Sequence, residues 1–272
     1  FGIGKAALMP FHRWLPAAMV APVPVSALLH AVAVVKAGVF AIVKVLVYVF
    51  GLDLLKGLGG GSEWLVYVSG ATVLIASVIA LRSDNLKRRL AYSTVSQLSY
   101  VIMAAAILTP LSVIGAALHI AAHAVGKITL FFAAGSIYTA AHKTEVSELN
   151  GIGRRMPWTM TAFAIGSLSM VGVPPAAGFV SKWYILLGAI EAEQTFAAAV
   201  IVLSTLLNAT YFLPIVYAAF LLPEDKRPKA KHGEAPLPIV SALMASAALT
   251  LALFAFPGAC LELARAVVGG YR

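Results

Sequence analysis

The feature that most constrains the fold is a series of long apolar segments separated by short charged connectors. A helix crosses the hydrocarbon core of a bilayer with about 20 residues. The segments with this property lie at 25–50, 63–82, 88–108, 111–141, 157–190, 195–222 and 236–257. The chain is 61% hydrophobic and 11% charged, whereas a soluble domain carries about 25% charged residues. The sequence therefore predicts an all-α polytopic membrane protein.

Three segments depart from a simple span. Residues 1–10 read as the second half of an apolar helix and lead into a Pro-rich connector at 11–24, so we expect a C-terminal fragment of a longer protein. The segment 111–141 is longer than a bilayer requires, which predicts that it tilts, bends or protrudes. The run Gly172-Val-Pro-Pro-Ala-Ala-Gly178 predicts a broken helix at membrane depth. Transporters commonly build ion sites at such breaks.

The positive charges gather in connectors that an alternating path places on one side of the membrane. These connectors hold most of the 20 Lys and Arg residues, namely Arg13, Arg82, Lys87, Arg88, Arg89, Lys143, Arg154, Arg155, Lys226, Arg227, Lys229 and Lys231. Cytoplasmic loops are enriched in Lys and Arg, so this side is predicted to be cytoplasmic and the C-terminus extracytoplasmic. We expect a multi-pass protein of the bacterial inner (plasma) membrane, in contact with the lipid bilayer. The net charge of +9 then reflects topology, and no nucleic acid partner is predicted.

Five lysines fall inside apolar segments, whereas all 11 acidic residues map to connectors, segment edges or the C-terminal tail. Lys44 lies near the end of its segment and is expected to reach the membrane interface. The other four are Lys5, Lys36, Lys127 and Lys182. A buried lysine without an acidic partner must lose its charge, meet water or pair with a group outside this chain.

Two histidines and a lysine repeat at intervals of four residues in His119-Ile-Ala-Ala-His123-Ala-Val-Gly-Lys127. This interval keeps side chains near one face of a helix. A charged lysine at the centre of a membrane helix costs about 2.5–3.5 kcal/mol, so a row of three ionisable groups indicates proton handling. His30 is a further candidate, and its alternative interpretation is a hydrogen-bonded core histidine.

Other chemistries find little support in the sequence. The His119-x-x-x-His123 spacing could serve zinc, but Ile120 stands where a zinc protease has its glutamate. The single Cys260 permits neither an intrachain disulfide nor a cysteine metal cluster. Because no phosphate-binding loop, nucleotide fingerprint or nucleophile triad is visible, we expect no cofactor, no metal and no redox site in this chain. Any electron transfer would belong to partner subunits.

Four sets of motifs resemble those of one membrane protein family. They are Lys5–Met19 with Ala21–His30 and Val35–Phe40; Asn85–Tyr100; His119–Lys127 with Leu130–Gly135; and Gly178–Lys182. The set is similar to the antiporter-like subunits of respiratory complex I, Mrp cation/proton antiporters and membrane-bound hydrogenases. The resemblance covers most of residues 1–190 and leaves the subfamily open.

The resemblance implies two inverted five-helix repeats with broken transmembrane helices and a polar axis along the membrane midplane. Residues 1–62 would end the first repeat, 63–222 would form the second, and 223–272 would add a cytoplasmic loop, a last transmembrane helix and a tail. Lys5 would be the lysine on the broken helix of the first repeat, with a glutamate partner on an earlier helix. Lys127 and Lys182 would be the central and terminal lysines of the second repeat. The histidines that bridge them through water would be His30, His119 and His123.

The predicted function is proton translocation by a component of a multi-subunit membrane complex. The candidate residues are Lys5, His30, Lys36, His119, His123, Lys127 and Lys182. Exchange of Na⁺ or K⁺ for protons is one alternative. Cations usually need oxygen ligands, and without an intramembrane carboxylate these would be backbone carbonyls at the breaks and the hydroxyls of Ser26, Ser93, Thr94 and Ser96. A purely structural subunit is the other alternative. The loop 223–234 is expected to be a solvated connector, with a partner contact as its alternative.

Overall fold

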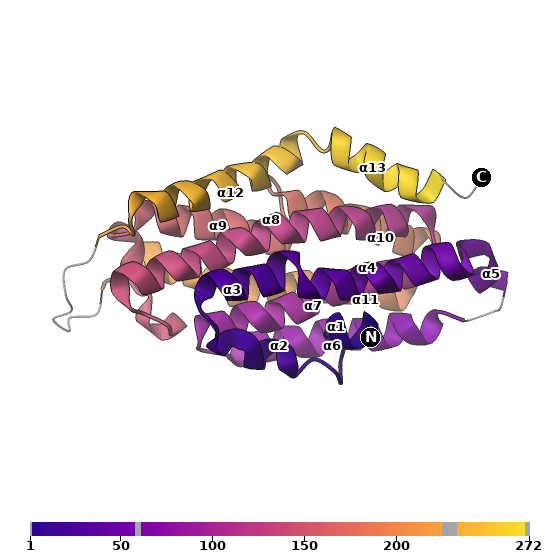
Figure 1. The fold of residues 1–272 in the computed structure, drawn as a ribbon, viewed down its shortest axis with the longest axis horizontal. Helices are drawn as coiled ribbons and strands as arrows, with labels where there is room; N and C mark the ends of the chain where they lie inside the picture. Colours follow the sequence, from indigo (N-terminus) through magenta and orange to yellow (C-terminus); the bar gives the residue numbers. More distant parts are fainter. Residues whose placement is uncertain (1, 58–60, 225–232, 270–272) are drawn as a thin grey trace.

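The computed structural model describes residues 2–57, 61–224 and 233–269, which form a single elongated bundle of helices (Figure 1). The central helices are α6 (Glu63–Arg82), α7 (Leu86–Ala106), α8 (Pro110–Ala141) and α11 (Thr195–Leu221). The helices α9 (Pro157–Val171), α10 (Ala177–Glu191) and α12 (Leu237–Ala255) pack around α8. Over the described ranges the chain has helices and no strand, which confirms the predicted all-α fold.

Among the described residues, five stretches are long and apolar enough to cross a membrane: Val23–Phe50, Glu63–Arg82, Pro110–Ala141, Thr195–Leu221 and Leu237–Ala255. The helix α7 is not among them, because serine, threonine, glutamine and arginine side chains interrupt its apolar residues. It packs between α6 and α8, and nearly all of its side chains are buried. The polar groups of these buried side chains therefore face protein, which is the arrangement that polar residues need at membrane depth.

The predicted break in the segment 157–190 is confirmed. The helix α9 ends at Val171 and α10 begins at Ala177, with Pro174 and Pro175 in the turn between them. Gly172 ends α9 in the left-handed conformation, with φ of 85° and its N–H bonded to the Leu168 carbonyl at 2.8 Å. Glycine adopts this conformation without the steric cost that other residues meet.

The first segments differ from the expectation of two simple apolar helices. The helix α1 (Gly2–Lys5) ends at Lys5, because Ala7 has a φ of 57° and the chain then turns at Pro10; the predicted helix over 1–10 is therefore too long. After α2 (Trp14–Ala17), the predicted 25–50 span consists of α3 (Val23–Ala27), a π-helical turn, α4 (Val34–Lys44) and a second π-helical turn.

The end of α1 lies against α4 at a glycine. A Cβ added to Gly38 would lie 2.4 Å from the Ala6 nitrogen, so only glycine permits this approach. The Trp14 indole donates to the carbonyl of Gly4 at 2.8 Å and holds the connector against the same turn. These contacts fix where Lys5 lies relative to α4.

The predicted C-terminal tail contains a helix that the sequence analysis did not assign. After α12, residues Gly258–Gly269 form α13. Its Ala264 packs against Ile114 and Leu118 of α8. A short helix, α5 (Leu52–Gly57), likewise follows α4.

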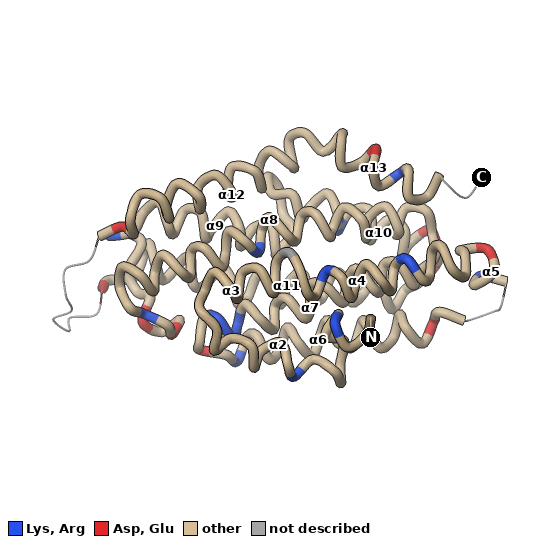
Figure 2. The backbone as a smooth tube through the Cα atoms, viewed as in Figure 1, with Lys and Arg blue, Asp and Glu red and all other residues tan. Residues whose placement is uncertain are grey.

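The basic connectors lie together at one end of the bundle (Figure 2). Lys87 donates to the Ala21 carbonyl at 2.8 Å, and the Val146 N–H donates to the Asp84 carbonyl at 2.8 Å. The Trp158 N–H donates to the Glu234 carboxylate at 2.7 Å, which brings the last connector to the same end. The predicted loop 223–234, with Lys226, Arg227, Lys229 and Lys231, falls largely outside the described residues. That this end faces the cytoplasm stays a prediction.

Candidate functional site

Lys182 bridges the helix break, because it lies on α10 and donates hydrogen bonds to the end of α9. Lys182, on the second turn of α10, is 4% exposed, and its Nζ donates to the carbonyl oxygens of Met170 at 2.8 Å and Val171 at 3.0 Å. These carbonyls are available because α9 ends there, and the last carbonyls of a helix have no partner within it. The ammonium also lies 4.8 Å from the centroid of the Tyr100 ring. The break thus supplies oxygen acceptors to a cation that has no carboxylate partner in the described ranges.

His119 of α8 is connected to the same break. Its Nδ1 lies 2.8 Å from the Ser181 hydroxyl, and its Nε2 lies 3.1 Å from the Gln97 side-chain oxygen. The Gln97 amide nitrogen donates in turn to the Met170 carbonyl at 3.3 Å. One backbone carbonyl therefore joins the His119 network to Lys182.

The Ser181 hydroxyl can take two orientations, and each suits a different charge state of the His119 ring. It lies within hydrogen-bonding distance of both the His119 Nδ1 and, at 3.0 Å, the Gly178 carbonyl, but it has a single hydrogen to donate. When that hydrogen is on Gly178 and Gln97 accepts from Nε2, both ring nitrogens of His119 must donate and the ring is an imidazolium. When the hydroxyl turns to Nδ1, the ring is neutral. This geometry accommodates a proton without moving a heavy atom.

Lys127 of α8 is held by α7. Its side chain is fully buried and donates to the Ser93 hydroxyl at 2.8 Å and the Leu90 carbonyl at 3.1 Å. The Phe212 ring of α11 lies 5.7 Å from the ammonium. Two polar side chains of α11 continue this network.

The continuation reaches the helix break. The Tyr211 hydroxyl lies 3.1 Å from the Ser93 hydroxyl and contacts the side-chain oxygen of Asn208. Because that amide oxygen can only accept, the single Tyr211 hydrogen goes to Asn208 when Ser93 donates to Tyr211. The Asn208 amide donates to the Met170 carbonyl at 3.3 Å, where Lys182 also donates. Lys127 and Lys182 are therefore joined by an uninterrupted series of hydrogen bonds.

Lys36 and two histidines lie on the side of α8 that faces α4. The Lys36 ammonium donates to the carbonyl of Ile120, which lies between His119 and His123 in the chain. The rings of His119 and His123 are 6.2 Å apart, and His30 packs 5.1 Å from Phe131. Both nitrogens of His30 and of His123 are buried without a hydrogen-bond partner among the described residues. Such groups are normally satisfied in proteins, so they are available to a transferred proton or a water molecule.

The sequence-predicted residues thus fall into two groups. The buried row comprises His30, Lys36, His119, His123, Lys127 and Lys182. Lys5 is exposed at the end of α1, beside Gly38 of α4. Lys44 is also exposed, and its position at the membrane interface stays a prediction.

Sequence reasoning missed several partners of the row. Gln97, Ser181, Tyr211 and Asn208 received no role, and Ser93 was considered only as a cation ligand. The available signal was their polarity inside apolar segments. In the described part of the chain, no group of three or more His, Cys, Asp or Glu residues is arranged to hold a metal ion.

These features define a class: polytopic helical membrane proteins with ionisable side chains buried between their helices and a broken helix beside them. Residues 2–208 match the family described as "NADH:quinone oxidoreductase/Mrp antiporter, TM". The chain belongs to this family, which confirms the resemblance found in the sequence motifs.

Relatives come from both branches of the family. The chain is 39% identical to NADH-quinone oxidoreductase subunit N of Desulforudis audaxviator over 241 residues, which cover 87% of this chain and 47% of that protein. It is 35% identical over 235 residues to the A/B component of a probable K(+)/H(+) antiporter of Rhizobium meliloti, covering 84% of this chain and 23% of the relative. The chain thus spans less than half the length of these relatives.

Solved structures share the fold. A chain of the Mrp complex from Dietzia sp. DQ12-45-1b superposes with a TM-score of 0.86 at 24% identity, covering 98% of this chain and 57% of that one. A chain of the membrane-bound sulfane sulfur reductase, an archaeal respiratory membrane complex, also gives 0.86 at 28% identity, covering 98% and 53%. The fold of this chain, with its helix break between α9 and α10, is therefore shared with chains of these membrane complexes.

Proposed function

We propose that this chain translocates protons along the buried row, as one subunit of a larger membrane complex in a bacterial inner membrane. The observation that supports this most strongly is the hydrogen-bonded connection from Lys127 through Ser93, Tyr211 and Asn208 to the Met170 carbonyl and Lys182. Ser and Tyr hydroxyls can donate and accept at once, so Ser93 and Tyr211 can pass a proton. The Asn208 amide and the carbonyl do not exchange protons readily, so they position the two ends.

The proposed route combines side chains with water. Protons approach through Lys5 and His30 and pass to Lys127, and Lys36 and His123 lead to His119 beside the Ile120 carbonyl. His119 then exchanges with Lys182 at the break. Residues 63–222 act as the second repeat in this scheme, residues 1–62 as the end of the first, and 223–272 as a loop, a last transmembrane helix and a tail.

Electrostatic coupling would drive transfer along the row. A charge on one lysine raises the free energy of a charge on the next, and a low-dielectric interior screens this repulsion weakly. Arrival of a proton at Lys36 would therefore favour release at a neighbour. Because no acidic side chain of the described ranges pairs with these lysines, the repulsion is not cancelled locally.

The direct test is Lys127→Ala in the complete complex. The variant is expected to abolish proton translocation in proteoliposomes while leaving assembly intact. Lys44→Ala, which removes an exposed lysine from α4, is the matched control and should pump normally. Normal pumping by Lys127→Ala would overturn the assignment. Unchanged transport after Lys182→Ala and His119→Ala together would indicate a purely structural subunit.

Exchange of Na⁺ or K⁺ for protons is a second candidate. One relative is named as part of a probable K(+)/H(+) antiporter, and the Met170 and Val171 carbonyls offer oxygen ligands at the break. In this structure both oxygens accept from Lys182, which would have to withdraw before a cation could bind. Dissipation of a pH gradient in vesicles that depends on added Na⁺ or K⁺ would favour this candidate.

A further inference from the structure

Arg89, near the start of α7, is a buried cation outside the proposed proton route. Its guanidinium donates to three backbone carbonyls. Two of them belong to the end of α6: Ser83 accepts from Nε at 2.8 Å, and Leu81 accepts from Nη2 at 3.4 Å. The last carbonyls of a helix have no partner within it, and a cation is favourable at that end. These two contacts alone would make Arg89 a cap for α6.

The third acceptor lies in a different helix. The Nη1 of Arg89 donates at 3.0 Å to the carbonyl of Tyr211, which lies 122 positions later, within α11. Tyr211 belongs to the connection between Lys127 and Lys182. An arginine stays charged in proteins and has no acceptor atom, so Arg89 can hold the Tyr211 carbonyl but cannot relay a proton.

The helix α7 contacts Tyr211 at both ends of the residue. Arg89 holds its carbonyl, and the Ser93 hydroxyl lies 3.1 Å from its phenolic hydroxyl. Residues four positions apart lie on the same side of a helix, so Arg89 and Ser93 face α11 together. The backbone and the hydroxyl of Tyr211 are therefore both fixed to α7.

The backbone of α11 has a local weakness beside Tyr211. Pro214 lies inside this helix. Proline has no N–H, so the Thr210 carbonyl receives no helical hydrogen bond from that position. Sharp bends in helices commonly occur at proline for this reason. A donor from outside the helix, such as Arg89, fixes the backbone at the turn where the helix has lost one of its own bonds.

We propose that Arg89 is a positioning residue, which places Tyr211 so that its hydroxyl stays within hydrogen-bonding distance of Ser93. The inference rests on the proposed function, in which this contact joins Lys127 to the helix break. The 3.1 Å between the two hydroxyls is already long, and an additional displacement of about 0.5 Å would break the hydrogen bond. Small shifts of the Tyr211 backbone would therefore interrupt the connection.

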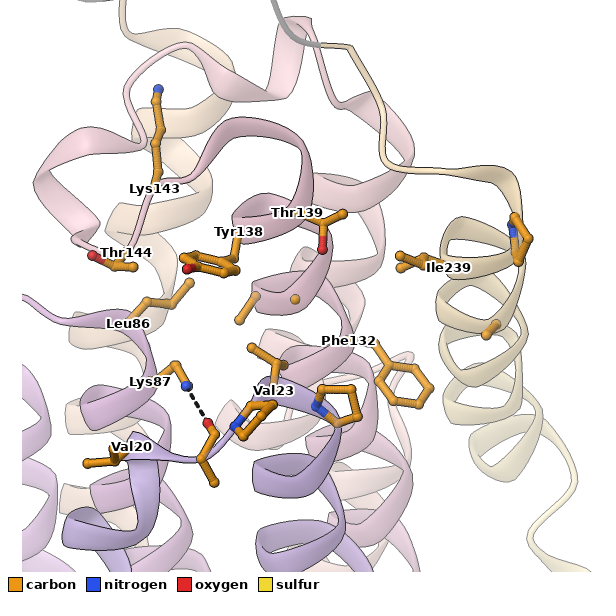
Figure 3. A pocket seen from close by; sticks show the side chains of 17 residues that line it. Val20, Val23, Leu86, Lys87, Phe132, Tyr138, Thr139, Lys143, Thr144 and Ile239 are labelled. Atoms are coloured by element: carbon orange, nitrogen blue, oxygen red, sulfur yellow. Dashed lines mark hydrogen bonds between the residues drawn. The ribbon is translucent and has the colours of Figure 1, made fainter.

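The first test is the initial rate of proton translocation by the complete complex in proteoliposomes. Arg89→Met keeps a side chain of similar length but removes all of its donors. We expect the rate to fall about tenfold or more, since a misplacement of about 1 Å can slow a reaction about 10²-fold. Lys87→Met is the matched control. Lys87 lies two positions earlier on α7 and donates to the Ala21 carbonyl at a cavity away from Tyr211 (Figure 3), so its loss should leave the rate unchanged.

The second test reports on Tyr211 itself. A meta-fluorotyrosine at position 211 gives a fluorine NMR resonance that depends on the surroundings of the ring. Arg89→Met is expected to move this resonance, and Lys87→Met is not. If Arg89 served only as a cap for α6, its loss would lower the midpoint of thermal unfolding without moving the resonance. Arg89→Lys keeps the charge but lacks the planar fork, so it should also move the resonance and provides a second variant should Arg89→Met fail to assemble.

The outcomes separate this inference from the proposed function. A resonance that stays in place in the assembled Arg89 variants would overturn the positioning role, and so would normal pumping by Arg89→Met. Tyr211→Phe is measured in parallel. Normal pumping by Tyr211→Phe would instead overturn the proton connection through Tyr211. Slow pumping by Tyr211→Phe together with a normal rate in Arg89→Met would leave that connection standing and remove only the role of Arg89.

Discussion

Lys182 donates to the Met170 carbonyl at 2.8 Å, across the break between α9 and α10. The same oxygen accepts from the amides of Gln97 and Asn208, each at 3.3 Å. A carbonyl oxygen has two lone pairs, so three donors compete for it. A shift of Lys182 would therefore alter the hydrogen bonds of both amides, and through them the surroundings of His119 and Tyr211.

Gly172→Ala is expected to displace Lys182. An added Cβ would lie 2.5 Å from the Lys182 Cδ, and the φ of 85° would cost a non-glycine residue about 1–2 kcal/mol. We expect a lower midpoint of thermal unfolding together with impaired proton translocation. Gly258→Ala is the control, because a Cβ there meets nothing within 4 Å. Full activity of Gly172→Ala would show that the position of Lys182 against the break is not needed.

Tyr211→Phe should interrupt the connection between the two lysines while preserving packing. It leaves Ser93 and Asn208 without a shared hydroxyl, at a cost in stability of about 1–3 kcal/mol. Loss of a proton-transfer group typically slows a reaction by about 10²–10⁴-fold, so initial pumping rates in proteoliposomes should fall markedly. Tyr100→Phe provides the control, since the Tyr100 hydroxyl contacts Ser204 and the ring remains beside Lys182. Equal rates in the two variants would contradict the proposed connection.

Gln97→Leu is predicted to uncouple His119 from the break. The substitution removes the acceptor at Nε2 of His119 and one donor to Met170, with little change in side-chain volume. Proton translocation should drop while the complex still assembles. Thr94→Val on the same helix is the matched control, because within the described ranges its hydroxyl donates to the Leu90 carbonyl of its own helix and to no other group. If Gln97→Leu pumps as well as Thr94→Val, His119 does not act through this amide.

Lys36→Met is expected to abolish proton translocation without lowering the stability of the fold. Replacing a buried ionisable group by an apolar one of similar size is often neutral or stabilising, so the midpoint of thermal unfolding should not fall. Proton translocation should be lost, because the row would no longer connect α4 to α8. Retained pumping would place the entry to the row elsewhere.

The helix break and the burial of the row could be predicted from the sequence because both depend on local signals. Gly172, Pro174 and Pro175 cannot continue a helix, and intervals of four residues put His119, His123 and Lys127 on neighbouring turns. The spans of α6, α8, α11 and α12 follow in the same way from apolar length.

The partners of the row could not be predicted in this way, because they lie far apart in the chain. Tyr211 meets Ser93 across 118 positions, and Lys36 meets the Ile120 carbonyl across 84. Backbone carbonyls carry no residue identity, so the acceptors at Met170 and Val171 are invisible in the sequence. The helix α13 was missed because its apolar stretch is too short to suggest a span.

The composition of α7 has a consequence for biosynthesis. A segment with Ser93, Gln97 and Arg89 among its buried residues partitions poorly into lipid when it emerges alone from the ribosome. Its stable state in the bilayer depends on α6, which precedes it, and on α8, which is made after it. We therefore expect α7 to insert stably into the membrane only when α8 has been synthesised. Ser93 and Leu90 of α7, which accept from Lys127, would then enter the membrane together with Lys127 of α8.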